Sequence, residues 1–101
     1  MSLKVIWSPS AKDDLKQIWN YLAQEASFAR ADDQVVKIET ACRKLLDFPF
    51  AGRSRDKLVP GLRTVVAAPY IVFYRTSDAA VDIVRVLDGR RNIDAILTSM
   101  P

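Results

Sequence analysis

Arginine side chains supply the most evident chemistry of this sequence, and they gather in its second half. Residues 1–50 carry seven basic and seven acidic side chains, whereas residues 51–101 carry eight basic and five acidic ones, so the net charge of +3 arises there. The planar guanidinium donates two parallel hydrogen bonds to a phosphate or a carboxylate. This half could therefore bind a nucleic acid or an acidic protein, with a solvated surface as the alternative. The candidate target-binding residues are Arg53, Arg55, Arg63, Arg85, Arg90 and Arg91.

The chain contains no histidine, which removes the commonest general base and the commonest metal ligand together. A Ser-His-Asp or Cys-His nucleophile is impossible, and the single cysteine, Cys42, excludes an internal disulfide and a cysteine metal cluster. The acidic pairs at 13–14 and 32–33 could suggest a metal or acid–base site, but adjacent helical side chains point about 100° apart and do not converge on one point. Both pairs are interpreted instead as favourable charges near helix starts. We therefore expect no catalytic residue, no metal ion and no cofactor.

Arg85 differs from the other arginines because it lies inside an apolar run. Strand alternation places Arg85 on one face with Ile83 and Leu87, and Val84 and Val86 on the other. A strand that is apolar on both faces is typical of the centre of a sheet. Burying a lone charge there is costly, so Arg85 either forms an ion pair with a helix carboxylate or reaches an open site.

Two helices are predicted in the first half of the chain, after an opening strand over residues 3–7. Ser8 can cap the first helix with Pro9 at its first position, and apolar residues then recur at the helical period. The second helix is expected over residues 28–47, with Cys42 on its apolar stripe as an inert core residue. The short connection between the two helices favours an antiparallel hairpin.

The second half changes to an extended pattern rich in β-branched and aromatic residues. Strands are predicted over residues 62–68, 70–75 and 81–87, and their short connections favour antiparallel pairing. Residues 92–97 are expected to form one or two turns of helix. The whole chain, residues 1–101, is predicted to be one α+β domain with the order β-α-α-β-β-β, in which the helical hairpin packs on a small, mostly antiparallel sheet.

Targeting signals are not evident in this sequence. No apolar run approaches the roughly 20 residues that a membrane span requires. The start, "MSLKVIWSPS", has too short an apolar stretch for a signal peptide, and charged residues follow it directly. Together with the single cysteine, these features favour a cytoplasmic protein without a membrane partner.

Five stretches taken together resemble the RelE/ParE superfamily of bacterial type II toxins. They are "WSPSAKDDLKQIWNYLA", "FPFAGRSRD", "VPGLRTV", "PYIVFYR" and "VDIVRVLDGRRN", and they follow the order in which that superfamily uses them over nearly the whole chain. The resemblance implies a compact β-α-α-β-β-β toxin domain. It also implies a cognate antitoxin that neutralises the toxin by wrapping an extended or helical segment around it.

The superfamily divides into RelE-like members, which cut messenger RNA on the ribosome, and ParE-like members, which inhibit DNA gyrase. RelE-like cutting needs proton-transfer groups as well as positive charge. Here Ile71 stands after Tyr70 where RelE-like members carry arginine, Ile96 stands where their terminal tyrosine falls, and only Arg90 with Arg91 matches a basic catalytic position. The resemblance is therefore closer to ParE-like members.

This resemblance implies a gyrase inhibitor rather than an enzyme, with no sequence-specific binding of nucleic acid. The alternative is a ribosome-dependent mRNA endoribonuclease with an atypical site, in which Arg85, Arg90 and Tyr74 would be the suspected groups. In either case the toxin would form a hetero-oligomer with its antitoxin, and the expected contact is the apolar surface of the helical hairpin. The candidate antitoxin-binding residues are Leu15, Trp19 and Leu22.

Overall fold

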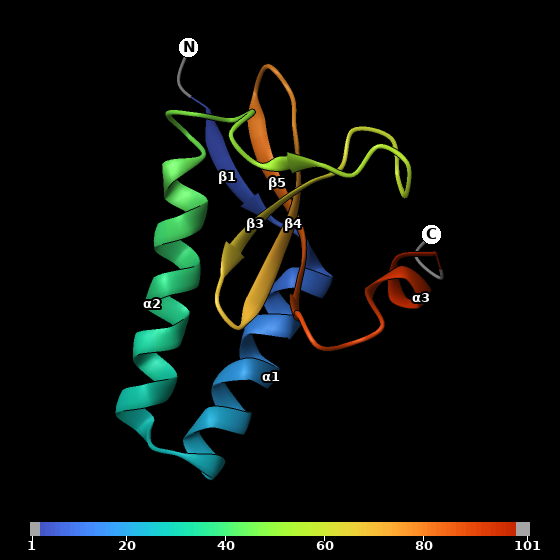
Figure 1. Cartoon of the computed structure of the whole chain (residues 1–101). Coiled ribbons are helices and arrows are strands. Elements are labelled where there is room, and N and C mark those ends of the chain that lie inside the picture. Colours follow the sequence, from blue (N-terminus) through green and yellow to red (C-terminus); the bar gives the residue numbers. More distant parts are fainter. Residues whose placement is uncertain (1–2, 99–101) are drawn as a thin grey trace.

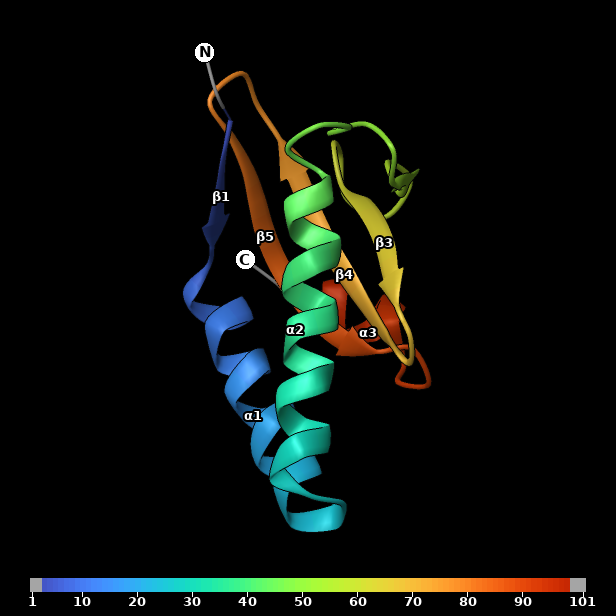
Figure 2. The ribbon, with the colours of Figure 1, turned by 90° about the vertical axis from the view of Figure 1, so that its left-hand side faces the viewer.

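A helical hairpin covers one face of a five-stranded sheet in the computed structural model, which describes residues 3–98 (Figure 1). The hairpin consists of α1 (Pro9–Glu25) and α2 (Phe28–Lys44), which lie side by side (Figure 2). The other elements are β1 (Lys4–Trp7), β2 (Arg53–Ser54), β3 (Arg63–Ala67), β4 (Tyr70–Thr76), β5 (Ala80–Asp88) and α3 (Ile93–Thr98). The sheet order is β1-β5-β4-β3-β2, with β1 parallel to β5 and the other pairs antiparallel. The predicted α+β fold is confirmed.

The start of α1 follows from its local sequence. The Ser8 hydroxyl accepts a hydrogen bond from the Ala11 backbone N–H at 3.0 Å, and Pro9 occupies the first helical position, where no N–H is needed. Ala11 and Ile18 are buried, so the apolar stripe faces the sheet as predicted. The acidic residues at 13–14 lie beyond the first turn of α1, so their interpretation as helix-start charges is wrong.

The second helix has a cap that sequence inspection missed. The Ser27 hydroxyl accepts a hydrogen bond from the Arg30 backbone N–H at 3.1 Å, which fixes the start of α2. Its buried stripe includes Cys42, which is 1% exposed and packs in the core as expected. The helix ends at Lys44 rather than Asp47, because the Leu45 N–H bonds to Cys42 three residues back and tightens the last turn.

The strands depart from the prediction in two places. β2 has only two residues, too few to show any periodicity in the sequence, and it extends the sheet beyond β3. A β-bulge interrupts β5: Tyr74 of β4 lies opposite Ile83, but Phe73 lies opposite Arg85, so Val84 is the extra residue. The predicted sharing of one face by Ile83 and Leu87 is therefore wrong, because the bulge reverses the alternation between them.

The sheet separates two apolar clusters. On the hairpin side, Ile83 and Val86 of β5 pack against the helices. On the other side, Leu87 joins Leu62, Phe73 and Leu97 of α3, so the short last helix covers part of that face (Figure 1). Between residues 3 and 98, every helix is too short or too polar to cross a membrane.

Candidate partner-binding surfaces

Arg85 pairs with a helix carboxylate, which is one of the two outcomes its sequence position allowed. Its Nε and Nη2 donate to the two carboxylate oxygens of Asp14 at 2.8 and 2.9 Å. The same carboxylate accepts a hydrogen bond from the Val86 backbone N–H at 2.9 Å. The side-chain hydrogen bonds that Arg85 donates to Asp14 raise the pKa of Arg85 above its ordinary value. Asp14 thus joins α1 to β5, and the Arg85 guanidinium is engaged within the chain.

The position of Asp14 follows from the way β1 leads into α1. β1 pairs with β5 only as far as Ile83, and the Ser8 N–H then donates to the Ile83 carbonyl at 3.0 Å. The Ser8 hydroxyl donates to the next carbonyl, that of Val84, at 2.8 Å. Asp14 takes the Val86 N–H farther along the same edge. Beyond the end of β1, Ser8 and Asp14 therefore provide hydrogen-bond partners for the backbone groups along the edge of β5.

Arg90 forms a second ion pair, in the turn after β5. Its backbone N, Nε and Nη2 donate to the Asp88 carboxylate at 2.9, 3.0 and 2.7 Å. The Arg90 side-chain and backbone hydrogen bonds lower the pKa of Asp88 to about 2. Arg90 and Arg91 are exposed, and they border a pocket of about 340 Å³ that also contacts Tyr21 and Tyr70. This turn therefore offers two accessible guanidinium groups beside a pocket with both polar and apolar lining residues.

The remaining candidate arginines lie at the other end of the sheet. Arg53 belongs to β2, and Arg63 donates to the Gly52 carbonyl at 2.8 Å while its guanidinium lies 5.2 Å from the ring centre of Phe50. Arg63 lies opposite Tyr74 at the end of β4, whereas Asp88 lies opposite Tyr70 at its beginning. The sheet therefore holds two separate basic groups, with Arg53, Arg55 and Arg63 in one and Arg90 and Arg91 in the other.

The three groups suspected for RNA cleavage each have a different partner within the chain. Tyr74 is fully buried, and its hydroxyl donates to the Pro49 carbonyl at 2.8 Å and accepts from the Gly52 N–H at 2.9 Å. Burial raises the pKa of Tyr74, which disfavours a role as proton acceptor. Arg85 is bound by Asp14 and Arg90 by Asp88, so each suspected group has its own partner within the chain.

The hairpin residues considered for antitoxin binding are partly occupied inside the chain. Leu15 and Leu22 pack against the hairpin-side core. The indole N–H of Trp19 donates to the Asp32 carboxylate at 2.8 Å, and its ring stacks on Phe28 with 5.5 Å between ring centres. These contacts hold α1 to α2. Asp32 therefore serves a tertiary hydrogen bond rather than the helix start, and the role of the three residues towards an antitoxin stays a prediction.

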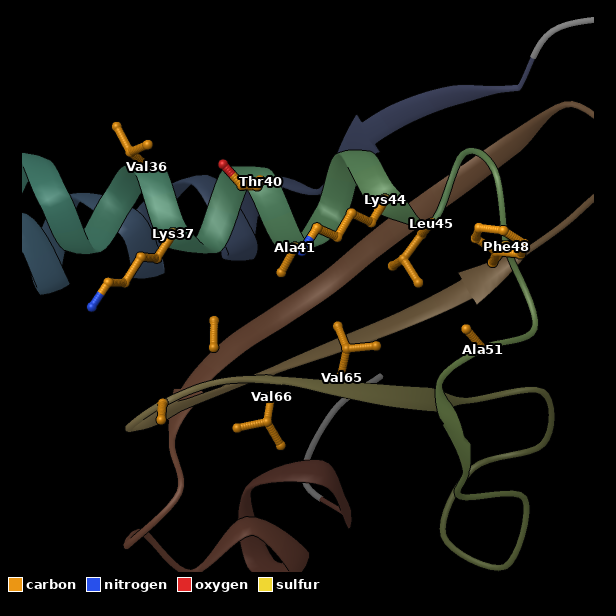
Figure 3. Close-up of a pocket in the computed structure, with 12 residues that line it drawn as sticks. Val36, Lys37, Thr40, Ala41, Lys44, Leu45, Phe48, Ala51, Val65 and Val66 are labelled. Atoms are coloured by element: carbon orange, nitrogen blue, oxygen red, sulfur yellow. The ribbon is translucent and has the colours of Figure 1, made fainter.

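A groove of about 670 Å³ between α2 and β3 is the apolar surface that sequence inspection missed (Figure 3). Its lining residues are Val36, Lys37, Thr40, Ala41 and Lys44 of α2, Leu45, Phe48 and Ala51 of the following loop, and Val65, Val66, Ala67 and Ala68 at the end of β3. The sequence signal was present as the uninterrupted run "TVVAA". Recognising it required knowing that β3 lies near the edge of the sheet.

A metal site and a reactive thiol are two further kinds of site that the described residues could form. Among residues 3–98, no three histidine, cysteine, aspartate or glutamate side chains gather in a way that could hold a metal ion. Burial, with a smaller contribution from Glu39, raises the pKa of Cys42 to about 12, so its thiol stays protonated near neutral pH. The surface of the described residues presents exposed arginine side chains and the apolar groove between α2 and β3.

The helical hairpin, the sheet with one parallel edge strand and the short terminal helix form the α+β fold that the resemblance to the RelE/ParE superfamily implies. The family model described as "ParE toxin of type II toxin-antitoxin system, parDE" matches residues 5–93. The chain belongs to this family.

Named relatives agree with this assignment. The chain is 36% identical over 94 residues to Toxin ParE3 of Caulobacter vibrioides, which covers 93% of this chain and 94% of that protein. It is 30% identical over 95 residues to Toxin ParE1 of Mycobacterium tuberculosis, covering 93% and 97%. It is also 32% identical over 88 residues to Toxin RelE2 of Caulobacter vibrioides, covering 87% and 97%.

A solved structure supports the fold independently of the named relatives. A chain of the solved structure "Chromosomal ParDE TA system from P. aeruginosa" superimposes with a TM-score of 0.75 at 22% identity, over 86% of this chain and 96% of that one. At this level of identity the match concerns the fold alone. The predicted membership of the RelE/ParE superfamily, on its ParE-like side, is confirmed by the family model and the named ParE relatives.

Proposed function

We propose that this toxin inhibits DNA gyrase by binding it, and that a cognate antitoxin neutralises the toxin by forming a complex with it. The observation that carries the proposal is that Arg85, Arg90 and Tyr74 are each held by a different partner within the chain. Cleavage of RNA needs a proton acceptor and a phosphate-binding group at one point. Binding needs only accessible charge and apolar anchors, and both are available on this surface.

The turn after β5 is the proposed gyrase contact. Arg91 is exposed, and Arg90 presents 81% of its side chain to solvent although Asp88 binds two of its nitrogens. Asp88 orients the Arg90 guanidinium, so less side-chain freedom is lost when a carboxylate or phosphate of the target approaches. Arg53, Arg55 and Arg63 form a second candidate contact at the far end of the sheet.

The antitoxin is proposed from family membership and from the structural neighbour, which is a chain of a ParDE system. The toxin fold leaves apolar surface accessible, and such surface on a small protein is typical of a protein interface. We accordingly expect the toxin to be isolated as a hetero-oligomer when both proteins are produced together.

Expression without the antitoxin tests the target. We expect growth arrest with blocked supercoiling and induction of the DNA-damage response. The purified chain should inhibit gyrase-catalysed supercoiling of relaxed plasmid. The double variant Arg90→Ala/Arg91→Ala should need about tenfold more protein for the same inhibition, because two charge-assisted contacts are lost.

Arg30→Ala/Arg43→Ala is the matched control, because it removes two exposed arginines from α2 and should leave inhibition within about twofold. If the wild type and the Arg90/Arg91 variant inhibit supercoiling equally well, this turn is not part of the interface with gyrase. Rapid translation arrest with cleaved messenger and unaffected supercoiling would replace gyrase by the ribosome as the target, as the named relative Toxin RelE2 would suggest.

A further inference from the structure

The groove between α2 and β3 leaves large apolar side chains exposed. Val36, Phe48 and Val66 all line it, and they are 54%, 69% and 70% exposed. Soluble monomers seldom keep several such side chains together on one surface, because each would gain free energy on leaving water. Nothing within residues 3–98 covers them. A partner that fills the groove would bury them.

The shape of the groove indicates where that partner runs. Figure 3 shows the side chains of Val65 and Val66 pointing to opposite sides of β3, with Val65 towards α2. β2 pairs only with Arg63 and Thr64, so in the described chain no strand borders β3 beyond Thr64 on that side. A partner that contacts both valines must lie along this outer edge of β3. An extended peptide segment fits such an edge.

The charge of the groove indicates the chemistry of the partner. Lys37 and Lys44 of α2 line it and are exposed, and no acidic residue is among its lining residues. Seven residues separate the two lysines, about two helical turns, so they present positive charge along the length of the groove. Acidic side chains on the partner would be attracted to both.

A second copy of this chain suits the groove less well than an acidic partner does. A twofold contact between two copies brings the same surface together from both sides. Lys37 and Lys44 of one copy would then approach the same lysines of the other, with no acidic lining residue to offset the repulsion. The charge pattern therefore favours a different molecule.

We propose that the groove between α2 and β3 holds an acidic segment of the antitoxin, which runs along the outer edge of β3. Its apolar side chains pack on Val36 and Val65, and its carboxylates lie beside Lys37 and Lys44. This proposal rests on the proposed function, because it names where the antitoxin binds. It also moves the expected contact from Leu15, Trp19 and Leu22 of α1 to the side of α2 that faces β3.

The test measures binding of the antitoxin encoded beside this toxin to purified variants. Lys37→Glu/Lys44→Glu should weaken the dissociation constant about 10- to 100-fold at low salt, with a smaller effect at high salt. Lys12→Glu/Lys16→Glu is the control, because it makes the same charge change on exposed positions of α1 and should stay within about threefold. A similar loss in the control would attribute the effect to net charge and overturn the assignment.

A second pair of variants tests the apolar contact. Val66→Asp should weaken binding about tenfold or more, whereas Ile6→Asp, at a half-exposed position on the opposite edge strand, should have little effect. Because both positions are exposed, both variants should keep the wild-type circular dichroism spectrum. Hydrogen exchange should also show the backbone of residues 65–68 protected in the complex.

The outcomes separate the two proposals. If the wild type binds the antitoxin and both groove variants bind equally well, the groove assignment is overturned and the proposed function stands. If the wild type does not bind the antitoxin, the proposed function fails and the groove assignment fails with it. If the free toxin dimerises and Val66→Asp makes it monomeric, the occupant is a second copy and the assignment is overturned.

Discussion

Two aspartate–arginine pairs in this chain have the same pattern of side-chain hydrogen bonds but differ in their exposure to solvent. Arg85 and Asp14 are 20% and 7% exposed, whereas Arg90 and Asp88 are 81% and 21% exposed. In each pair the arginine donates two side-chain hydrogen bonds to one carboxylate. The first pair joins residues 71 positions apart, and the second joins residues two positions apart.

The difference lies in what each pair can do for the molecule. The Arg85–Asp14 pair connects α1 to β5 and satisfies a strand N–H, so it contributes to the fold and has little surface to offer a partner. The Arg90–Asp88 pair is local and largely hydrated, so it adds little to stability but holds a guanidinium in place at the surface. The same chemical motif is therefore structural at one site and available for binding at the other.

Replacing Asp14 by alanine should have the largest effect on stability. The substitution leaves the Arg85 guanidinium and the Val86 N–H without their acceptor, so we expect the free energy of unfolding to fall by about 3 kcal/mol. Urea denaturation followed by circular dichroism measures this change. Asp13→Ala is the control, because Asp13 is exposed on the same helix and accepts a hydrogen bond from Gln17 but none from Arg85; it should shift stability by less than about 0.5 kcal/mol. Equal effects would mean that the ion pair does not stabilise the fold.

These pairs also illustrate how far the sequence predicts the structure. The helices were predictable because Ser8, Pro9 and the apolar stripes are local signals. The pairing of Arg85 was one of two predicted outcomes, but Asp14 lies 71 residues away and no local pattern connects them. The bulge at Val84 places Leu87 on the opposite face from the predicted one. It was not predictable, because a single extra residue does not change the pattern of a short apolar run.

The surfaces were less predictable than the elements that carry them. Arg90 and Arg91 were identified from residue type and position, and they are exposed as a binding role requires. Their separation from Arg53 depends on strand register, which sequence spacing alone does not determine. The α2–β3 groove depends on the short length of β2, which leaves Val66 beyond the paired part of the edge. Such features arise from tertiary arrangement.

Double-mutant cycles on the two pairs sharpen the comparison. The single and double alanine variants of Asp14 and Arg85 should give a coupling energy of about 2 kcal/mol, because both groups are shielded from solvent. The same cycle on Asp88 and Arg90 should give a clearly smaller coupling, because water screens that pair; the lowered pKa of Asp88 means that the coupling is not zero. A coupling as large as that of Asp14 and Arg85 would show that the Asp88–Arg90 pair contributes substantially to the stability of the fold. That result would weaken the assignment of the turn after β5 as a surface available for binding.

Titration of Asp88 is the smallest predicted effect and the most specific one. The Arg90 side-chain and backbone hydrogen bonds lower the pKa of Asp88 from 3.8 to about 2 in the folded state. Since the folded pKa lies below the unfolded one, the pair stabilises the fold above about pH 4, and this contribution is lost as the pH falls towards 2. Carboxyl chemical shifts in NMR should therefore place the midpoint of Asp88 near pH 2.

The variant Arg90→Ala provides the matching measurement, because it removes the side-chain donors and keeps the backbone N–H of residue 90. The pKa of Asp88 should then rise towards its ordinary value. The stability difference between the wild type and Asp88→Asn should likewise be constant from about pH 7 to 5 and shrink between about pH 4 and 2. An Asp88 midpoint that does not move in Arg90→Ala would mean that Asp88 does not hold the guanidinium in solution. Arg90 would then meet its target as a freely rotating side chain rather than as an oriented one.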